Sequence, residues 1–177
     1  MHSISTRTGD EGLTGLLYGQ RVPKDHPQIE AVGCFDEFNS ALGVAKANCP
    51  VPERRAELER VQKELVALMG EVVCAEENAE RYASSKFEKI DEACLARMDA
   101  GVAALEAKKL NFDGWATPGA NAHAASLDLA RAMGRRAERR LVTLASHGKT
   151  IRPVTRQYVN RLCDLLWLMA RDAETGT

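Results

Sequence analysis

The segment from Thr6 to Lys24 combines residue types that suit the binding of an anion. It reads TRTGDEGLTGLLYGQRVPK, so glycines, threonines and cations recur in it with little apolar periodicity. Glycine lets backbone N–H groups approach a ligand closely, and threonine hydroxyls and cations complement phosphate oxygens. The segment is therefore predicted to be irregular, neither helix nor strand, and is a candidate phosphate-binding loop. The alternative is a solvated N-terminal arm without a ligand.

A second group of charged residues lies in the run RAMGRRAERR, from Arg131 to Arg140, within a predicted helix. On a helical wheel, Arg131, Arg135 and Glu138 fall on the flank of an apolar stripe that is predicted to be buried. The stripe consists of Leu127, Ala130, Ala137, Leu141 and Leu144. Arg136 and Arg140 point away from that stripe, which predicts a half-buried trio and a solvated pair. Half-buried arginines need anionic partners, because an unpaired buried charge costs several kcal/mol. The partner is either an anionic ligand or, within the chain, Glu138 in a salt-bridge network.

Two further polar groups lie on predicted helices. Asn160 and Asp164 are one turn apart, and Asp36 is followed about one turn later by Asn39 and Ser40. On these residues alone, an exposed polar helix face is the simpler interpretation of each group.

Several other chemistries are excluded by the sequence. It contains no GxxxxGK[ST] loop and no Glu-x-x-His pair, which excludes a P-loop enzyme and a ferritin-like di-iron site. The four histidines are scattered, in no arrangement with Ser or Cys that suggests a nucleophile–base pair. The five cysteines are odd in number and form no CxxC, so we expect no protein-bound metal site and reduced, packed thiols in a cytoplasmic protein.

The overall charge and hydropathy exclude further classes of partner. The net charge of −1 provides no global field that would attract nucleic acid, so any anion site must be local. There is no signal peptide and no apolar run long enough to span a bilayer, so no membrane partner is expected.

Helices must position the candidate residues, because apolar side chains recur at three- and four-residue steps through most of the chain. Scarce aromatic residues and plentiful alanine and leucine also favour helix, and no strand is expected. The predicted helices span residues 27–48, 53–77, 90–108, 120–146 and 153–173, with irregular segments at 78–85 and 111–119. The predicted fold class is all-α: one domain, 1–177, in which an irregular N-terminal loop (1–26) precedes a five-helix bundle (27–177).

Taken in order, these pieces resemble the PduO-type ATP:cob(I)alamin adenosyltransferases. The resemblance rests on six stretches: TRTGDEGLT from Thr6, RVPK ending at Lys24, EAVGCFDEFNSALG from Glu30, TPGA from Thr117, ARAMGRRAERR from Ala130 and NRLCDLL from Asn160. It covers nearly the whole chain, and the stretches are distinctive in combination.

The resemblance implies a homotrimer that binds ATP between adjacent subunits. Its N-terminal loop would wrap the triphosphate, and the residues near it would be Thr6, Arg7, Gly9, Thr14 and Lys24. The neighbouring subunit would hold the nucleotide through Arg135, Glu138 and Asn160. Asp36 and Arg131 match a family pair that forms a salt bridge across the subunit boundary, near the corrinoid.

The resemblance also implies the reaction. In this family cobalt(I) of the corrinoid attacks the 5′ carbon of ATP and triphosphate leaves, giving adenosylcobalamin. Cobalt(I) is already a strong nucleophile, so the protein positions the reactants and stabilises the leaving triphosphate with cations and Mg²⁺. The expected catalytic residues are Arg135, Asp36, Arg131 and Trp115. A flavin-dependent reductase and an adenosylcobalamin-dependent enzyme are the expected partners besides ATP and cob(I)alamin.

Trp115 is the main departure from the family pattern. The family places Phe three residues before Pro-Gly, in an FILPG-like stretch, where the ring displaces the lower axial ligand of cobalt and eases its reduction. Here the stretch is WATPG, from Trp115 to Gly119, while Phe112 lies at a different offset. Trp115 is aromatic and could act in the same way, but it is larger and its N–H needs a partner. The alternative is a side chain that packs against the end of the bundle.

Two other functional classes remain open on the sequence. A nucleotide- or corrinoid-binding carrier or sensor without efficient turnover would be consistent with Trp115 and with the short segment after Arg171. A purely structural trimeric bundle would leave the glycine–threonine loop and the arginine trio unexplained.

Overall fold

The computed structural model describes residues 5, 7–110 and 114–175. This part of the chain contains six α-helices, one short 3-10 helix and a two-stranded antiparallel sheet. The strands are β1 (Leu13–Gly15) and β2 (Arg21–Pro23). The helices are α1 (Pro27–Ala47), α2 (Pro52–Val72), the 3-10 helix (Glu76–Asn78), α3 (Ala79–Ala83), α4 (Glu92–Glu106), α5 (Ala122–Ser146) and α6 (Pro153–Glu174).

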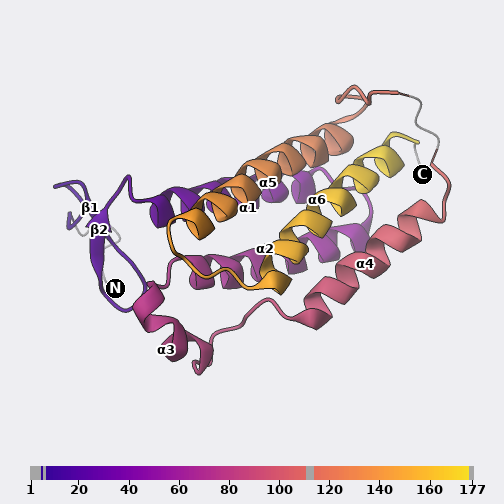
Figure 1. The fold of residues 1–177 in the computed structure, drawn as a ribbon. Coiled ribbons are helices and arrows are strands. Elements are labelled where there is room, and N and C mark those ends of the chain that lie inside the picture. The colour runs from indigo at the N-terminus through magenta and orange to yellow at the C-terminus, as the bar shows by residue number, and fades with distance from the viewer. Residues whose placement is uncertain (1–4, 6, 111–113, 176–177) are drawn as a thin grey trace.

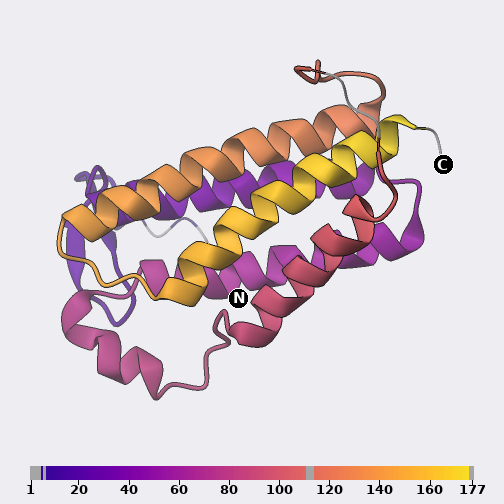
Figure 2. The ribbon, with the colours of Figure 1, turned by 45° about the vertical axis from the view of Figure 1, so that its right-hand side comes forward.

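The five longer helices form an elongated bundle, with the sheet and α3 at one end (Figure 1). Helix α1 packs against α2 and α5, and α6 packs against α4 and α5, as the second view shows (Figure 2). The core between them is apolar, with Phe35, Phe38 and Leu42 of α1 fully buried. Removal of such side chains from water, at about 25 cal/mol per Å² of apolar area, is the main favourable contribution to folding.

The helix ends follow local sequence signals. Proline occupies the first turn of α1, α2 and α6, where a missing N–H costs no helical hydrogen bond. Asn121 caps α5 by accepting a hydrogen bond from Ala124 N at 2.9 Å. Gly148 follows α5 with a φ of 85°, a conformation that glycine adopts without strain.

The predicted helices are present as α1, α2, α4, α5 and α6. The buried stripe predicted for α5 is confirmed, because each member is at most 1% exposed: Leu127, Ala130, Ala137, Leu141 and Leu144. Helix α2 ends at Val72, earlier than the predicted Glu77.

The predicted count of five helices was wrong, since α3 and the 3-10 helix occupy much of the segment that was predicted to be a loop. A five-residue helix is unstable by itself, because its nucleation is costly. Tyr82 of α3 is only 6% exposed, and its hydroxyl donates to Ala67 O of α2 at 3.2 Å. Packing against α2 therefore holds α3 in place.

The prediction of an N-terminal segment without strands was also wrong. Strands β1 and β2 pair with Thr14 opposite Val22. Val22 and Leu16 are buried together with Ala75 in a small second core, so the hairpin gains packing that its own sequence does not signal. In the connecting turn Gly19 has a φ of 93°.

All five cysteines are free thiols, and all but Cys94 are buried. Burial raises the pKa of Cys163 to about 12, so that its thiol stays protonated at neutral pH. Within the described residues, no helix combines the length and the apolarity needed to cross a membrane.

Candidate functional site

The N-terminal segment is held in a defined shape by its own hydrogen bonds. Arg21 Nη2 donates to Thr8 O at 2.6 Å, which ties β2 to the loop that precedes β1. Lys24 N donates to Gly12 O at 2.9 Å, and Gly12 N donates to Gly9 O at 3.2 Å. Arg21 is thus engaged in folding the loop, whereas sequence reasoning treated it only as one of several cations.

Two of the predicted triphosphate residues are in contact. The Lys24 ammonium lies over Gly9, in the space that a side chain at this position would need. A Cβ built on Gly9 would be 3.1 Å from Lys24 Nζ. Thr14 is partly buried in β1, and Arg7 is exposed with a φ of 55°. Thr6 lies outside the described residues. The loop therefore presents a cation beside a glycine backbone, which is a suitable surface for an anionic group.

The second half of the candidate site lies on α5 and α6. Glu138 accepts from Arg135 Nη1 at 2.5 Å and from Asn160 Nδ2 at 3.0 Å. The tertiary structure therefore brings together the three residues expected to hold a nucleotide, and it also forms the internal network that was the alternative interpretation. Beside them is a hollow of about 370 Å³ lined by Glu138, Leu141, Val142, Arg156, Gln157, Asn160 and Arg161.

The predicted half-buried state is confirmed for Arg131 and Glu138, and the predicted exposure is confirmed for Arg136 and Arg140, but the prediction was wrong for Arg135. Side chains of Arg135 and Arg136 are each 46% exposed, so exposure does not separate them. Arg136 Nη2 lies 2.7 Å from Glu37 Oε2, and Arg140 Nε lies 3.2 Å from Glu30 Oε1. A single-helix wheel omits the neighbouring α1, whose carboxylates give these two arginines their partners.

Arg131 and Asp36 form no ion pair with each other within the described chain. Arg131 Nε lies 3.9 Å from Asp128 Oδ1, and this nitrogen is buried with no hydrogen-bond partner among the described residues. Asp36 is exposed on α1, and no ion pair joins it to a described residue. A buried donor without an acceptor is costly, so the site at Arg131 is short of an acceptor.

Trp115 is 95% exposed, in the segment that joins α4 to α5. This segment is at the end of the bundle where α6 finishes, opposite the sheet (Figure 1). The alternative in which Trp115 packs against the bundle is therefore wrong for this chain by itself. Phe112 lies outside the described residues.

Sequence reasoning missed a group of buried charges at the same end of the bundle. Arg171 Nη2 donates to Asp128 Oδ2 at 2.5 Å, and both side chains are only 4% exposed. The neighbouring Asp172 accepts from Arg54 and, at 2.7 Å, from Lys108 Nζ. The sequence did contain a signal for this burial, because the three- to four-residue spacing of the buried side chains of α6 reaches Asp172.

The described residues contain no group of three or more His, Cys, Asp and Glu side chains that could hold a metal ion. A magnesium ion needs no such group when it enters with a nucleotide, because substrate phosphates and water supply most of its ligands.

Comparison with known proteins connects these features. A family model for cobalamin adenosyltransferase matches residues 4–173. The corrinoid adenosyltransferase PduO of Salmonella typhimurium is 40% identical over 172 residues, which are 96% of this chain and 49% of that protein. The chain thus spans about half the length of this relative. A corrinoid adenosyltransferase of Citrobacter freundii is 37% identical over 99% of this chain and 97% of its own length.

Solved structures agree with the sequence relatives. A variant PduO-type ATP:corrinoid adenosyltransferase from Lactobacillus reuteri, complexed with cobalamin and ATP, superposes with a TM-score of 0.87 at 27% identity, covering 98% of this chain and 91% of that one. A second variant of the Lactobacillus reuteri enzyme, complexed with ATP, gives a TM-score of 0.85 at 26% identity over 98% and 94% of the two chains. The chain described here belongs to the cobalamin adenosyltransferase family.

Proposed function

We propose that this protein transfers the 5′-deoxyadenosyl group of ATP to cob(I)alamin, giving adenosylcobalamin and triphosphate. The observation that carries the proposal is the Arg135–Glu138–Asn160 cluster beside a hollow of about 370 Å³, in a chain matched to the family over residues 4–173. The cluster offers a guanidinium already oriented by a carboxylate, which is an arrangement suited to binding phosphate groups.

The nucleotide site is shared between subunits of a homotrimer. Within one chain the sheet lies at the end of the bundle where α5 finishes (Figure 1), whereas Arg135 lies near the middle of α5. From Arg135 to Ser146 the helix rises about 16 Å. Arg135 is therefore about 16 Å along α5 from the end of the bundle that carries the sheet, which supports a site whose two halves come from neighbouring subunits.

The loop and the cluster have separate tasks in this reaction. Lys24, Arg7 and the Gly9 backbone, with Thr6 and Thr14, hold the triphosphate, and Mg²⁺ enters with it as part of the substrate. Arg135 stabilises charge on the departing triphosphate, and Glu138 and Asn160 fix its orientation. No residue need act as a base, because the nucleophile is the reduced cobalt of the second substrate.

The corrinoid side consists of Asp36, Arg131 and Trp115. Arg131 Nε has no hydrogen-bond partner and lies 3.9 Å from Asp128, and Asp36 has no ion pair among the described residues, which supports a salt bridge between Asp36 and Arg131 of neighbouring subunits. Trp115 is exposed at the end of the bundle where α6 finishes, and its ring can lie against the lower face of the corrinoid.

An anaerobic assay tests the reaction. Purified protein is mixed with ATP, Mg²⁺ and chemically reduced cob(I)alamin, and loss of the cobalt(I) absorbance band is followed. We expect ATP-dependent formation of adenosylcobalamin, with Arg135→Ala losing most of the rate and Arg139→Ala, an exposed change on the same helix, retaining it. ATP binding without conversion would contradict catalysis and favour the carrier or sensor.

Subunit complementation tests the shared site. Lys24→Met and Arg135→Ala proteins are each expected to be nearly inactive. After the two are unfolded together and refolded as a 1:1 mixture, about a quarter of sites would combine an intact loop with an intact cluster, if each site draws its halves from two subunits. A mixture as inactive as its components would show that both halves act within one chain.

A further inference from the structure

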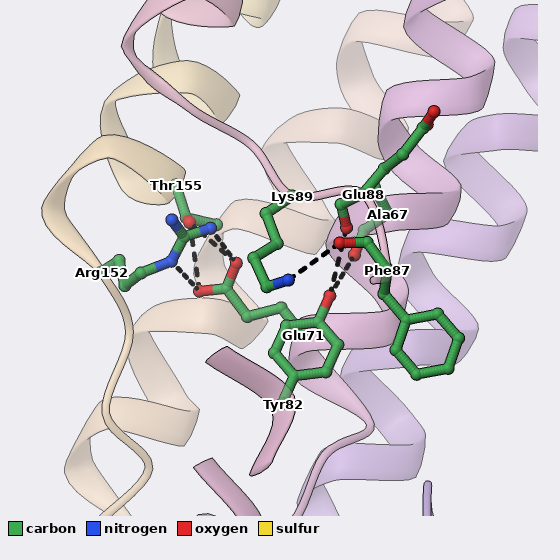
Figure 3. Close-up of polar contacts among 8 residues, drawn as sticks. All are labelled: Ala67, Glu71, Tyr82, Phe87, Glu88, Lys89, Arg152 and Thr155. Atoms are coloured by element: carbon green, nitrogen blue, oxygen red, sulfur yellow. Dashed lines mark hydrogen bonds and ion pairs between the residues drawn. The ribbon is translucent and has the colours of Figure 1, made fainter. Parts of the chain in front are cut away.

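A second hollow, of about 280 Å³, lies at the opposite side of the molecule from Trp115, and no part of the proposed reaction uses it. We call it the α3 pocket. It is formed by the end of α2, by α3, by the segment before α4 and by the α5–α6 connection. The residues that matter below are Glu71, Glu76, Tyr82, Lys89, Lys149 and Arg152. Figure 3 shows Glu71, Tyr82, Lys89 and Arg152 converging from these separate elements.

Glu71 is already neutralised in this pocket. Its carboxylate is buried and accepts from Arg152 Nε at 3.0 Å and Arg152 Nη2 at 2.6 Å. Thr155 Oγ1 lies 3.2 Å from both carboxylate oxygens. With both oxygens engaged, Glu71 is not available to bind a further cation.

Glu76 is neutralised in the same way. Lys149 Nζ lies 3.3 Å from Glu76 Oε2, and the backbone N–H of Thr150 donates to that oxygen at 3.0 Å. The Lys149 side chain is only 9% exposed, so this pair forms part of the pocket wall.

Lys89 has no carboxylate partner among the described residues. Its ammonium donates to the carbonyl oxygens of Ser85 at 3.0 Å and Phe87 at 2.8 Å, and it lies 5.1 Å from the centroid of the Tyr82 ring. An ammonium has three N–H donors, so one donor remains for a ligand. The three cations and two carboxylates that line the pocket leave a net charge of +1.

We propose that the α3 pocket binds a small organic monocarboxylate with an apolar body, whose carboxylate pairs with Lys89. One negative charge balances the pocket, and the partly buried Lys89 gains the anionic partner that the chain does not supply. The apolar body lies against Ala79 and the Tyr82 ring, which line the pocket. The volume of about 280 Å³ is just below the usual range of about 300–1,000 Å³ for ligand sites, which restricts the ligand to a small molecule. This site is independent of the proposed adenosyl transfer.

Hexanoate and hexanamide test the proposal, because they share an apolar chain and differ in charge. Binding is followed by backbone amide chemical shifts in ¹⁵N-labelled full-length protein. Hexanoate is expected to shift amides of the pocket, including Tyr82, Lys89 and Thr150, and hexanamide to bind at least tenfold more weakly. Equal binding of the two compounds, or no shifts in the pocket at about 20 mM hexanoate, would overturn the proposal.

Three variants assign the charge and the cavity. Lys89→Met keeps the length of the side chain and is expected to weaken hexanoate binding at least tenfold, with hexanamide unaffected. Lys86→Met, an exposed change in the same segment, should leave binding as in the parent protein. Ala79→Leu fills the cavity without altering charge and should abolish binding of both compounds, which keeps the test decisive if Lys89→Met does not fold. Undiminished hexanoate binding by folded Lys89→Met or Ala79→Leu protein would place the ligand elsewhere.

Discussion

Asn160 of α6 donates a hydrogen bond from Nδ2 to Glu138 Oε1 of α5 at 3.0 Å, in the wall of the hollow that we assign to the nucleotide. The other carboxylate oxygen accepts from Arg135. Glu138 therefore holds two different helices' side chains in one orientation. In the proposed reaction it is a positioning group, because it fixes the guanidinium that we propose contacts the phosphates.

Glu138→Gln should raise the KM for ATP and leave the thermal midpoint of unfolding nearly unchanged. Loss of a charge-assisted hydrogen bond is worth about 1.5–3 kcal/mol in binding, or roughly tenfold or more in KM. The thermal midpoint should change little, because partly exposed ion pairs contribute about 0–1 kcal/mol. Steady-state kinetics and thermal unfolding check both expectations. Glu59→Gln, which removes an exposed ion pair with Lys63 on α2, is the matched control. An equal effect of the two changes on the KM for ATP would contradict the role of Glu138 in positioning Arg135.

Trp115 should become less exposed when a corrinoid binds. It is 95% exposed in the chain by itself, whereas Trp167 is packed against the core. The fluorescence of Trp115 is obtained as the difference between the emission of the parent protein and that of Trp115→Phe protein. Addition of cob(II)alamin with ATP is expected to quench this fluorescence and shift it to the blue. The same variant should retain the thermal midpoint, because an exposed ring contributes little to folding. Unchanged Trp115 emission at saturating corrinoid would exclude this residue from the site.

The buried pair of Asp128 and Arg171 should be costly to break. Asp128→Asn removes one of the two carboxylates that pair with the buried Arg171, the other being Glu174 at 2.9 Å, and breaking a buried pair costs up to about 3–5 kcal/mol. The double change Asp128→Leu with Arg171→Met removes both charges and should recover much of this loss. Urea unfolding measures each free energy. Asp99→Asn, at an exposed pair with Arg161, should cost no more than about 1 kcal/mol. Equal losses in Asp128→Asn and Asp99→Asn would contradict the argument.

Stability should fall below neutral pH because of His123. Burial lowers its pKa from the ordinary value, and the buried Nε2 has no hydrogen-bond partner among the described residues. The unfolded chain therefore binds a proton at about pH 6.5, where folded His123 stays neutral. This contribution is present above about pH 6.5 and is lost as pH falls toward the lowered pKa of the folded state. Denaturant unfolding between pH 7 and 5 should show a shallower decline for His123→Gln than for the parent protein; identical slopes would contradict this assignment.

The sequence determined the five longer helices, four of them to within two residues at each end and α2 to within five. Apolar spacing specified α1, α2, α4, α5 and α6, because a helix that buries one face must repeat its apolar side chains every three to four residues. The six stretches that begin with TRTGDEGLT at Thr6 indicated the family, and the family model over residues 4–173 shows that the chain belongs to it. They also supplied the list of candidate site residues, which only substitution experiments will test.

Only the tertiary structure decided how those residues meet. The hairpin and α3 depend on burial of Val22 and Tyr82 against distant segments, and no local pattern signals such burial. Arg136 contacts Glu37 across 99 residues of sequence, so a wheel of one helix could not place it. The contact of Asn160 with Glu138 joins side chains from separate elements, and packing of separate elements also leaves Lys89 without a carboxylate partner among the described residues. Interactions of this kind are set by packing in three dimensions, whereas helical periodicity is set by the chain itself.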